Sequence, residues 1–172
     1  MKGIKGVKIQ YIFDIHNLNF EENRVLPLLN TVFGQGGGSL LFNEIRTHKG
    51  LAYEVGSSIK NERGIKLFSI KIGTCIENID KVISTVDSVI EKFKHSPLDF
   101  KNEEIKFKIK NMKLKYEIKR EKSIEFCKES VIRELMNDNY FLQEDTYKIE
   151  AWHINQVAGK FMKQPSIQIL RG

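Results

Sequence analysis

Cysteine is scarce in this sequence: the 172 residues include only Cys75 and Cys127, and neither belongs to a CxxC pair. Small secreted proteins that lack a large core are dense in disulfides, so this usage argues against a disulfide scaffold and is typical of the reducing cytosol. A single bridge between the two cysteines stays open at this stage. We expect a cytoplasmic protein.

A long apolar run is also missing. No stretch approaches the roughly 20 apolar residues that a membrane-spanning helix requires. The N-terminal segment 1–15 carries lysines, as a signal peptide does, but Lys8, Gln10 and Asp14 interrupt its apolar residues. We therefore expect neither a signal peptide nor a membrane partner.

Closely spaced histidines are absent too. Each of the four histidines lacks a second histidine within five residues; they are His16, His48, His95 and His153. Zinc peptidases need two imidazoles in helical register to hold the metal and a glutamate beside them to activate water. The sequence therefore predicts no metal site and no catalytic residue in this chain. No G-x-S-x-G pattern supports a serine nucleophile either.

The charge balance is basic, with 28 lysines and arginines against 22 acidic residues and a net charge of +6. Such a balance can attract nucleic acid, a membrane surface or acidic peptides, and the sign alone selects none of them. The lysine-rich stretch 101–122 is interspersed with glutamates, which is typical of a solvated helix face. We expect no nucleic-acid partner; a nucleic-acid binder that uses this stretch is the minor alternative.

Hydrophobic periodicity predicts one α+β domain over residues 1–172. A chain of this length with 41% hydrophobic residues can bury one core, and no linker or repeat divides it. The expected strands are 7–15, 51–60, 65–74 and 166–170, and the expected helices are 20–33, 77–93, two between 98 and 136, 146–151 and 154–162. We expect an antiparallel or mixed sheet of about four strands with long helices packed largely on one face.

Two helix boundaries need a separate prediction. Pro27 is unfavourable inside a helix, so the helix that stops before Gly34 is expected to begin at about Arg24 or to be kinked. The long helical region after residue 98 is expected to break near Arg120 or Ser123.

Four glycines within five positions follow the first predicted helix. They are Gly34, Gly36, Gly37 and Gly38. Glycine accepts positive φ and lets the backbone approach another chain closely. A phosphate-binding loop would need a lysine after the last glycine, and a dinucleotide fingerprint would follow a strand, so neither fits. We interpret the cluster as a helix stop joined to a helix start, with Ser39 as the N-cap of a short amphipathic helix that ends at Arg46.

Arg46 and Tyr53 are the candidate binding residues. A tight turn at residues 49–50 can bring their side chains to one place. The guanidinium offers a fork of donors for a peptide carbonyl, and the phenol can donate to the oxyanion that forms when an amide is attacked. The alternative is purely structural: Arg46 pairs with Glu44 or another acid, and Tyr53 packs in the core.

The stretch 36–53 also carries a family resemblance. It reads GGGSLLFNEIR, then GLAY after three residues, and this pattern resembles the signature of the second domain in each half of insulinase-like (pitrilysin-type) zinc metallopeptidases. The resemblance covers most of the chain and is most specific over residues 33–58. It implies a non-catalytic domain that binds a peptide substrate through Arg46 and Tyr53. Which half of such a peptidase the domain corresponds to stays open.

The same resemblance implies partners and a cofactor outside this chain. Zinc would be held by another domain or subunit, because the H-x-x-E-H order of this family is absent here. The glycine cluster 34–38 would lie near the interface with that zinc-bearing partner. The alternative function is a catalytically inactive module of the same fold that binds a protein or peptide partner.

Overall fold

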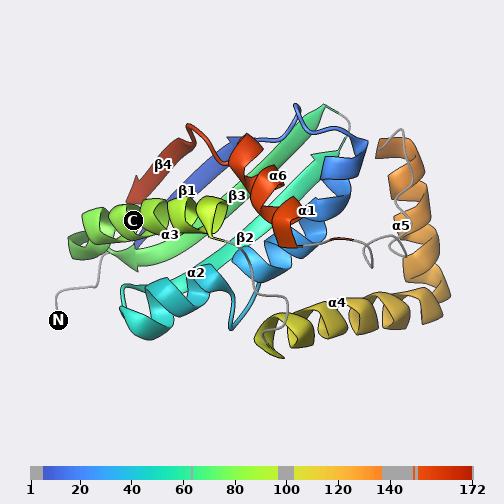
Figure 1. Cartoon of the computed structure of the whole chain (residues 1–172), viewed down its shortest axis with the longest axis horizontal. Coiled ribbons are helices and arrows are strands. Elements are labelled where there is room, and N and C mark those ends of the chain that lie inside the picture. The colour runs from blue at the N-terminus through green and yellow to red at the C-terminus, as the bar shows by residue number, and fades with distance from the viewer. Residues whose placement is uncertain (1–5, 63, 97–102, 137–148, 150, 172) are drawn as a thin grey trace.

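The computed structural model describes residues 6–62, 64–96, 103–136, 149 and 151–171 (Figure 1). They form an α+β fold in which helices pack against a four-stranded sheet. The strands are β1 (Gly6–Asp14), β2 (Ala52–Glu62), β3 (Ile65–Cys75) and β4 (Ser166–Arg171). The helices are α1 (Phe20–Phe33), α2 (Leu40–Phe42), the π-helix η1 (Asn43–His48), the 3-10 helix η2 (Ile76–Asn78), α3 (Ile79–His95), α4 (Glu103–Glu121), α5 (Ser123–Met136) and α6 (Ala151–Phe161).

The sheet is antiparallel throughout, in the order β2-β3-β1-β4. β2 and β3 form the expected hairpin, whereas β1 and β4 come from opposite ends of the chain, with Val7 opposite Arg171. The α+β class and the four expected strands are therefore confirmed.

Helices α1, α3 and α6 cover one face of the sheet (Figure 1). Burial along β1 alternates accordingly: Val7, Ile9, Tyr11 and Phe13 are at most 1% exposed, whereas Lys8 on the opposite face is exposed. This alternation is what the sequence pattern predicts for a strand with one buried face. We call the opposite face the helix-free face, since none of the described helices covers it.

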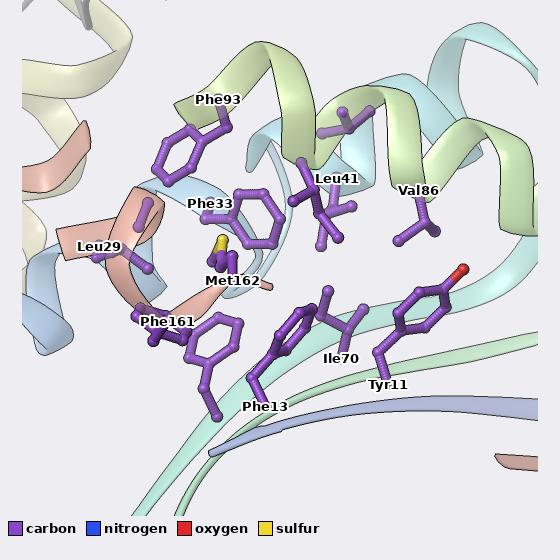
Figure 2. Packing of buried hydrophobic residues seen from close by; sticks show 14 of the residues in the cluster. Tyr11, Phe13, Leu29, Phe33, Leu41, Ile70, Val86, Phe93, Phe161 and Met162 are labelled. Atoms are coloured by element: carbon purple, nitrogen blue, oxygen red, sulfur yellow. The ribbon is translucent and has the colours of Figure 1, made fainter. Parts of the chain in front are cut away.

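The core lies between the sheet and these helices, as Figure 2 shows. Phe33 of α1 and Phe93 of α3 have ring centroids 4.8 Å apart, and Phe68 of β3 and Phe161 of α6 are 5.3 Å apart. Burying an aromatic or aliphatic side chain of this size contributes roughly 1.5–3 kcal/mol. The first contact thus packs α1 against α3, and the second packs α6 against the central strand β3.

Tyr11 brings a polar group into this core. Its side chain is fully buried, and its hydroxyl donates to the main-chain carbonyl of Ile83 at 3.4 Å. Burial, reinforced by the Asp87 carboxylate, raises the pKa of Tyr11 well above its ordinary value. The phenol therefore stays neutral in the folded protein.

Helix α1 spans the expected residues, Phe20–Phe33. The alternative start at about Arg24 is therefore wrong. The Asn19 side chain accepts from the Glu22 N–H at 2.9 Å, and the Glu22 side chain accepts from the Asn19 N–H at 2.8 Å. This capping box stabilises the first turn, and burial of the apolar side chains of α1 offsets the cost of Pro27, which lies inside the helix.

The remaining helices follow the predicted pattern with one change. α3 matches the strongest periodic stretch, and α4 and α5 meet at residue 122, within the predicted break. Instead of a helix over 154–162, α6 covers Ala151–Phe161, and the helix expected over 146–151 lies mostly outside the described residues. Within the described chain, no helix is both long and apolar enough to cross a membrane.

Candidate functional site

The glycine loop starts where α1 meets β2. Gly34 ends α1, and its carbonyl accepts the Ser57 N–H of β2 at 3.0 Å. A Cβ at position 34 would overlap the Ser57 hydroxyl and would lie 3.1 Å from the buried Leu41 side chain. Gly34 therefore permits a close approach within this chain, and that approach holds the loop against the sheet edge.

The other three glycines differ from one another. Gly36 and Gly38 have φ of 79° and 76°, the left-handed region that favours glycine, whereas Gly37 is not in that region. All three are exposed. Ser39 then acts as the predicted N-cap, accepting the Phe42 N–H at 3.4 Å and donating to the Gly36 carbonyl at 2.9 Å. The loop thus reverses the chain between two helices, as expected.

The helix after Ser39 is longer and wider than predicted. The three residues of α2 lead directly into the π-helix η1, which continues past Arg46 to His48. A π-helix has a wider turn than an α-helix. Ile45 on its inner side is fully buried, and the Ile45 carbonyl accepts the Leu51 N–H at 2.9 Å. Gly50, with φ of 60°, donates to the Arg46 carbonyl at 3.2 Å. These bonds form the predicted tight turn.

Arg46 lies on the exposed side of η1. Its guanidinium carbon is 5.1 Å from the centroid of the Phe42 ring, a cation–π contact. The predicted alternative partner, Glu44, instead contacts His48 at 3.4 Å and Lys49 at 3.3 Å. Hydrogen bonds from these two side chains hold the pKa of Glu44 below its ordinary value. Pairing of Arg46 with Glu44 is therefore wrong, and no ion pair among the described residues includes Arg46.

Tyr53 lies on the helix-free face at a β-bulge. Ala52 is opposite Thr74 and Glu54 is opposite Gly73, so Tyr53 is the extra residue of β2. A Cβ at Gly73 would lie 2.7 Å from Cζ of Tyr53, so the tyrosine ring occupies the space above this glycine. Tyr53 is 52% exposed, and the alternative that it packs in the core is wrong.

The Tyr53 hydroxyl reaches across β3 toward β1. A Cβ at Gly6, the first residue of β1, would lie 3.2 Å from this oxygen. Two glycines on neighbouring strands therefore leave room for one tyrosine. Sequence reasoning missed Gly6 and Gly73, because neither stands near position 53 in the sequence.

The turn brings the main chain of Arg46 close to that of Gly50, three residues before Tyr53. No hydrogen bond or ring contact in the described part of the chain joins the two candidate side chains. Arg46 belongs to the helical layer, whereas Tyr53 lies on the helix-free face at the start of β2. That their side chains bind one ligand stays a prediction.

Among the described residues, no three histidine, cysteine, aspartate or glutamate side chains are close enough to hold a metal ion. His16 contacts Asp14 at 2.5 Å and His95 contacts Glu91 at 3.5 Å, each an exposed pair with one carboxylate. The described residues of this chain therefore do not fit a zinc site.

Comparison with known proteins identifies the family. The model of the family described as "Peptidase M16 inactive domain" matches residues 1–112. The chain belongs to this family. No curated protein matches the chain by sequence. The matched M16 residues include the glycine loop, the turn and both candidate side chains.

Solved structures share the fold of this M16 domain. A conserved protein from Enterococcus faecalis V583 aligns with a TM-score of 0.82 at 19% identity, covering 97% of this chain and 39% of that one. A protease from Helicobacter pylori aligns with a TM-score of 0.78 at 20% identity, over 98% of this chain and 41% of that one. An inactive peptidase domain from Bordetella parapertussis aligns with a TM-score of 0.77 at 13% identity, over 96% of this chain and 92% of that one. The chain thus spans about two fifths of the first two proteins and nearly all of the third.

Proposed function

We propose that this chain is the substrate-binding, non-catalytic domain of an insulinase-like zinc metallopeptidase. Zinc belongs to another domain or subunit in this proposal, and the peptide substrate contacts Arg46 and Tyr53. Membership of the M16 inactive-domain family supports a non-catalytic role. The proposed complex is cytoplasmic and needs no nucleic acid or membrane.

One observation carries the proposal: two polar residues on either side of a single turn expose their side chains, while two apolar residues of the preceding helix are buried. Arg46 is exposed and Tyr53 is 52% exposed, whereas Leu41 and Ile45 are fully buried. The bulge makes Tyr53 the extra residue of β2, and its ring lies on the helix-free face. Such an arrangement suits a surface that meets a ligand.

The chemistry of the two side chains fits an extended peptide. The guanidinium of Arg46 has several donors in one plane and binds a carbonyl or carboxylate. The Tyr53 hydroxyl donates to a carbonyl oxygen and stabilises negative charge that develops there. The glycine loop 34–38, exposed beyond Gly34, is the proposed contact with the zinc-bearing partner.

The test starts from the assembly that contains this chain in its source cell. Its native mass and zinc content are measured first, and peptide cleavage is then compared between the wild type and two variants. Arg46→Ala is expected to lower kcat/KM by about 10-fold or more and Tyr53→Phe by about 3–10-fold, the loss of a charged and of a neutral hydrogen bond.

Lys81→Ala, at an exposed position of α3, is the control and should leave cleavage unchanged. Turnover that neither Arg46→Ala nor Tyr53→Phe alters removes both residues from the site. A zinc-free species with a mass of 20.0 kDa would instead favour the inactive interaction module.

A further inference from the structure

The two edges of the sheet are built differently. Along β2, the Ser57 N–H is already bonded to Gly34, the bulge at Tyr53 interrupts the ladder, and Lys60 and Glu62 add exposed charge. Natural proteins use these features to prevent an edge strand from pairing with another chain. The β2 edge is therefore closed to strand addition.

The β4 edge has neither a bulge nor a bond to a loop, and its one charged residue is Arg171 at the end of the strand. The strand pairs with β1 in a regular register, and all six of its residues are exposed. Ile167 and Ile169 are 40% and 41% exposed, and Leu170 is 66% exposed. Ser166–Arg171 contains no proline, glycine or lysine. No described residue pairs with the outer side of β4, so the strand presents a regular edge on which three of the six residues are apolar.

The hydrogen-bond pattern shows which groups of β4 point outward. The Ile15 N–H, just after β1, donates to the Lys66 carbonyl in β3, so the odd-numbered residues of β1 direct their main-chain groups to β3. The even-numbered residues of β1 therefore face β4, where they are opposite even-numbered residues. The main-chain N–H and C=O groups of Ile167 and Ile169 consequently point away from the sheet.

We propose that β4 pairs antiparallel with β4 of a second copy of this chain. The two-fold axis passes between the two copies of Gln168, and Ile167 of each copy lies opposite Ile169 of the other. These isoleucine pairs exchange the outward main-chain hydrogen bonds, and their side chains lie together on the helix side of a sheet that continues through both copies.

The sequence of β4 favours a second copy as the occupant. The two residues that flank Gln168 are both isoleucines, so self-pairing places each isoleucine opposite an isoleucine. Ser166 lies opposite Leu170, and the charged Arg171 lies beyond these pairs, so like charges are not opposed. An isologous contact of this kind also closes, because each copy uses the same edge, the one regular edge among the described strands.

The expected dimer is weak. A six-residue strand buries less surface than a standard interface, and weak complexes are typical of that size class. Each copy also carries a net charge of +6, which opposes association at low salt. Association should therefore strengthen between about 0.05 and 0.5 M salt as charge repulsion is screened. The proposal does not rest on the zinc-bearing partner, so either can fail alone.

Disulfide trapping tests the register. In the 172-residue chain with Cys127→Ser, Gln168→Cys places two thiols opposite each other across the axis. The Cα separation of about 4.5 Å in such a pair lies within the range of disulfides. Mild oxidation should give a covalent dimer of twice 20.0 kDa. Ser166→Cys is the matched control: its two copies are several residues apart along the strands, so it should remain monomeric. Equal trapping of both variants, or of neither, overturns the proposal.

Sedimentation of the unmodified chain over a concentration series tests the surface itself. Ile169→Lys should weaken the dimer at least about tenfold, because a charge replaces an apolar side chain at the contact. Ile65→Lys is the control, since Ile65 is 42% exposed at the far end of β3. A chain that stays monomeric at every concentration, or a dimer that Ile169→Lys leaves intact, contradicts the proposal.

Discussion

Gly34→Ala tests most directly how the glycine loop is held against the sheet. The new Cβ would overlap the Ser57 hydroxyl, lie 2.7 Å from Ser57 Cβ and lie 3.1 Å from Leu41 Cδ1. The Ser57 Cβ cannot rotate away, because it is attached to a main chain whose N–H bonds to the Gly34 carbonyl. Leu41 is fully buried and has little room to move. The strand or the end of α1 must therefore shift.

The size of this effect follows from overpacking. Forcing an extra methyl into a packed site costs about 1–3 kcal/mol, and here two neighbours resist, so we expect about 2–3 kcal/mol. For a domain of this size each kcal/mol lowers Tm by about 2–4 °C, which gives a decrease of about 4–12 °C. Urea unfolding followed by circular dichroism measures the free energy directly.

Gly37→Ala is the matched control for this prediction. Nothing lies within 4 Å of a Cβ at Gly37, and its φ is outside the left-handed region, so the change should stay within about 0.5 kcal/mol. Ser57→Gly in the Gly34→Ala background removes the overlapping atoms and should recover part of the loss. If Gly34→Ala and Gly37→Ala unfold at the same urea concentration, the packing argument is refuted.

Three further changes have defined outcomes. Gly73→Ala should displace the exposed Tyr53 ring and lower the free energy of unfolding by less than about 1 kcal/mol. In the Tyr53→Ala background the same change should be neutral or stabilising by about 0.4–1 kcal/mol. A double-mutant cycle that shows no coupling between the two positions contradicts this contact. Asn19→Ala removes the cap of α1 and should cost about 1 kcal/mol in urea unfolding, whereas an unchanged midpoint would mean that the cap is dispensable. Because the pKa of Tyr11 is raised in the folded state, its contribution to stability is complete below the unfolded pKa of about 10 and is lost as pH rises above it. The urea midpoint should thus fall above about pH 10 in the wild type and less steeply in Tyr11→Phe; parallel profiles would exclude this cause.

Local features of the fold could be predicted because they depend on neighbours in the sequence. Alternation along β1 and β3 marks strands with one buried face, and apolar spacing over residues 79–93 marks α3. Ser39 was recognisable as an N-cap for the same reason. The alternative start of α1 at about Arg24 was wrong because the penalty of Pro27 was considered without the capping box of Asn19.

The candidate site could be predicted only in part. Arg46 and Tyr53 could be selected from their spacing and from the family pattern, and the turn between them follows from Gly50. The π-helix and the bulge could not be predicted, because each adds a residue to a regular pattern and so changes which side chain faces outward. The position of the Tyr53 ring depends on Gly73, which leaves room for it and lies 20 residues away in the sequence.

The sequence by itself determined the positions of most helices and strands, the absence of a paired-histidine motif and the pattern shared with M16 domains. Tertiary structure decided which strands are neighbours, why Gly34 is required and which edge of the sheet stays open. The physical reason is the distance along the sequence over which each interaction acts. Side-chain alternation and caps act within a few residues, whereas the pairing of β4 with β1 depends on how the whole core packs.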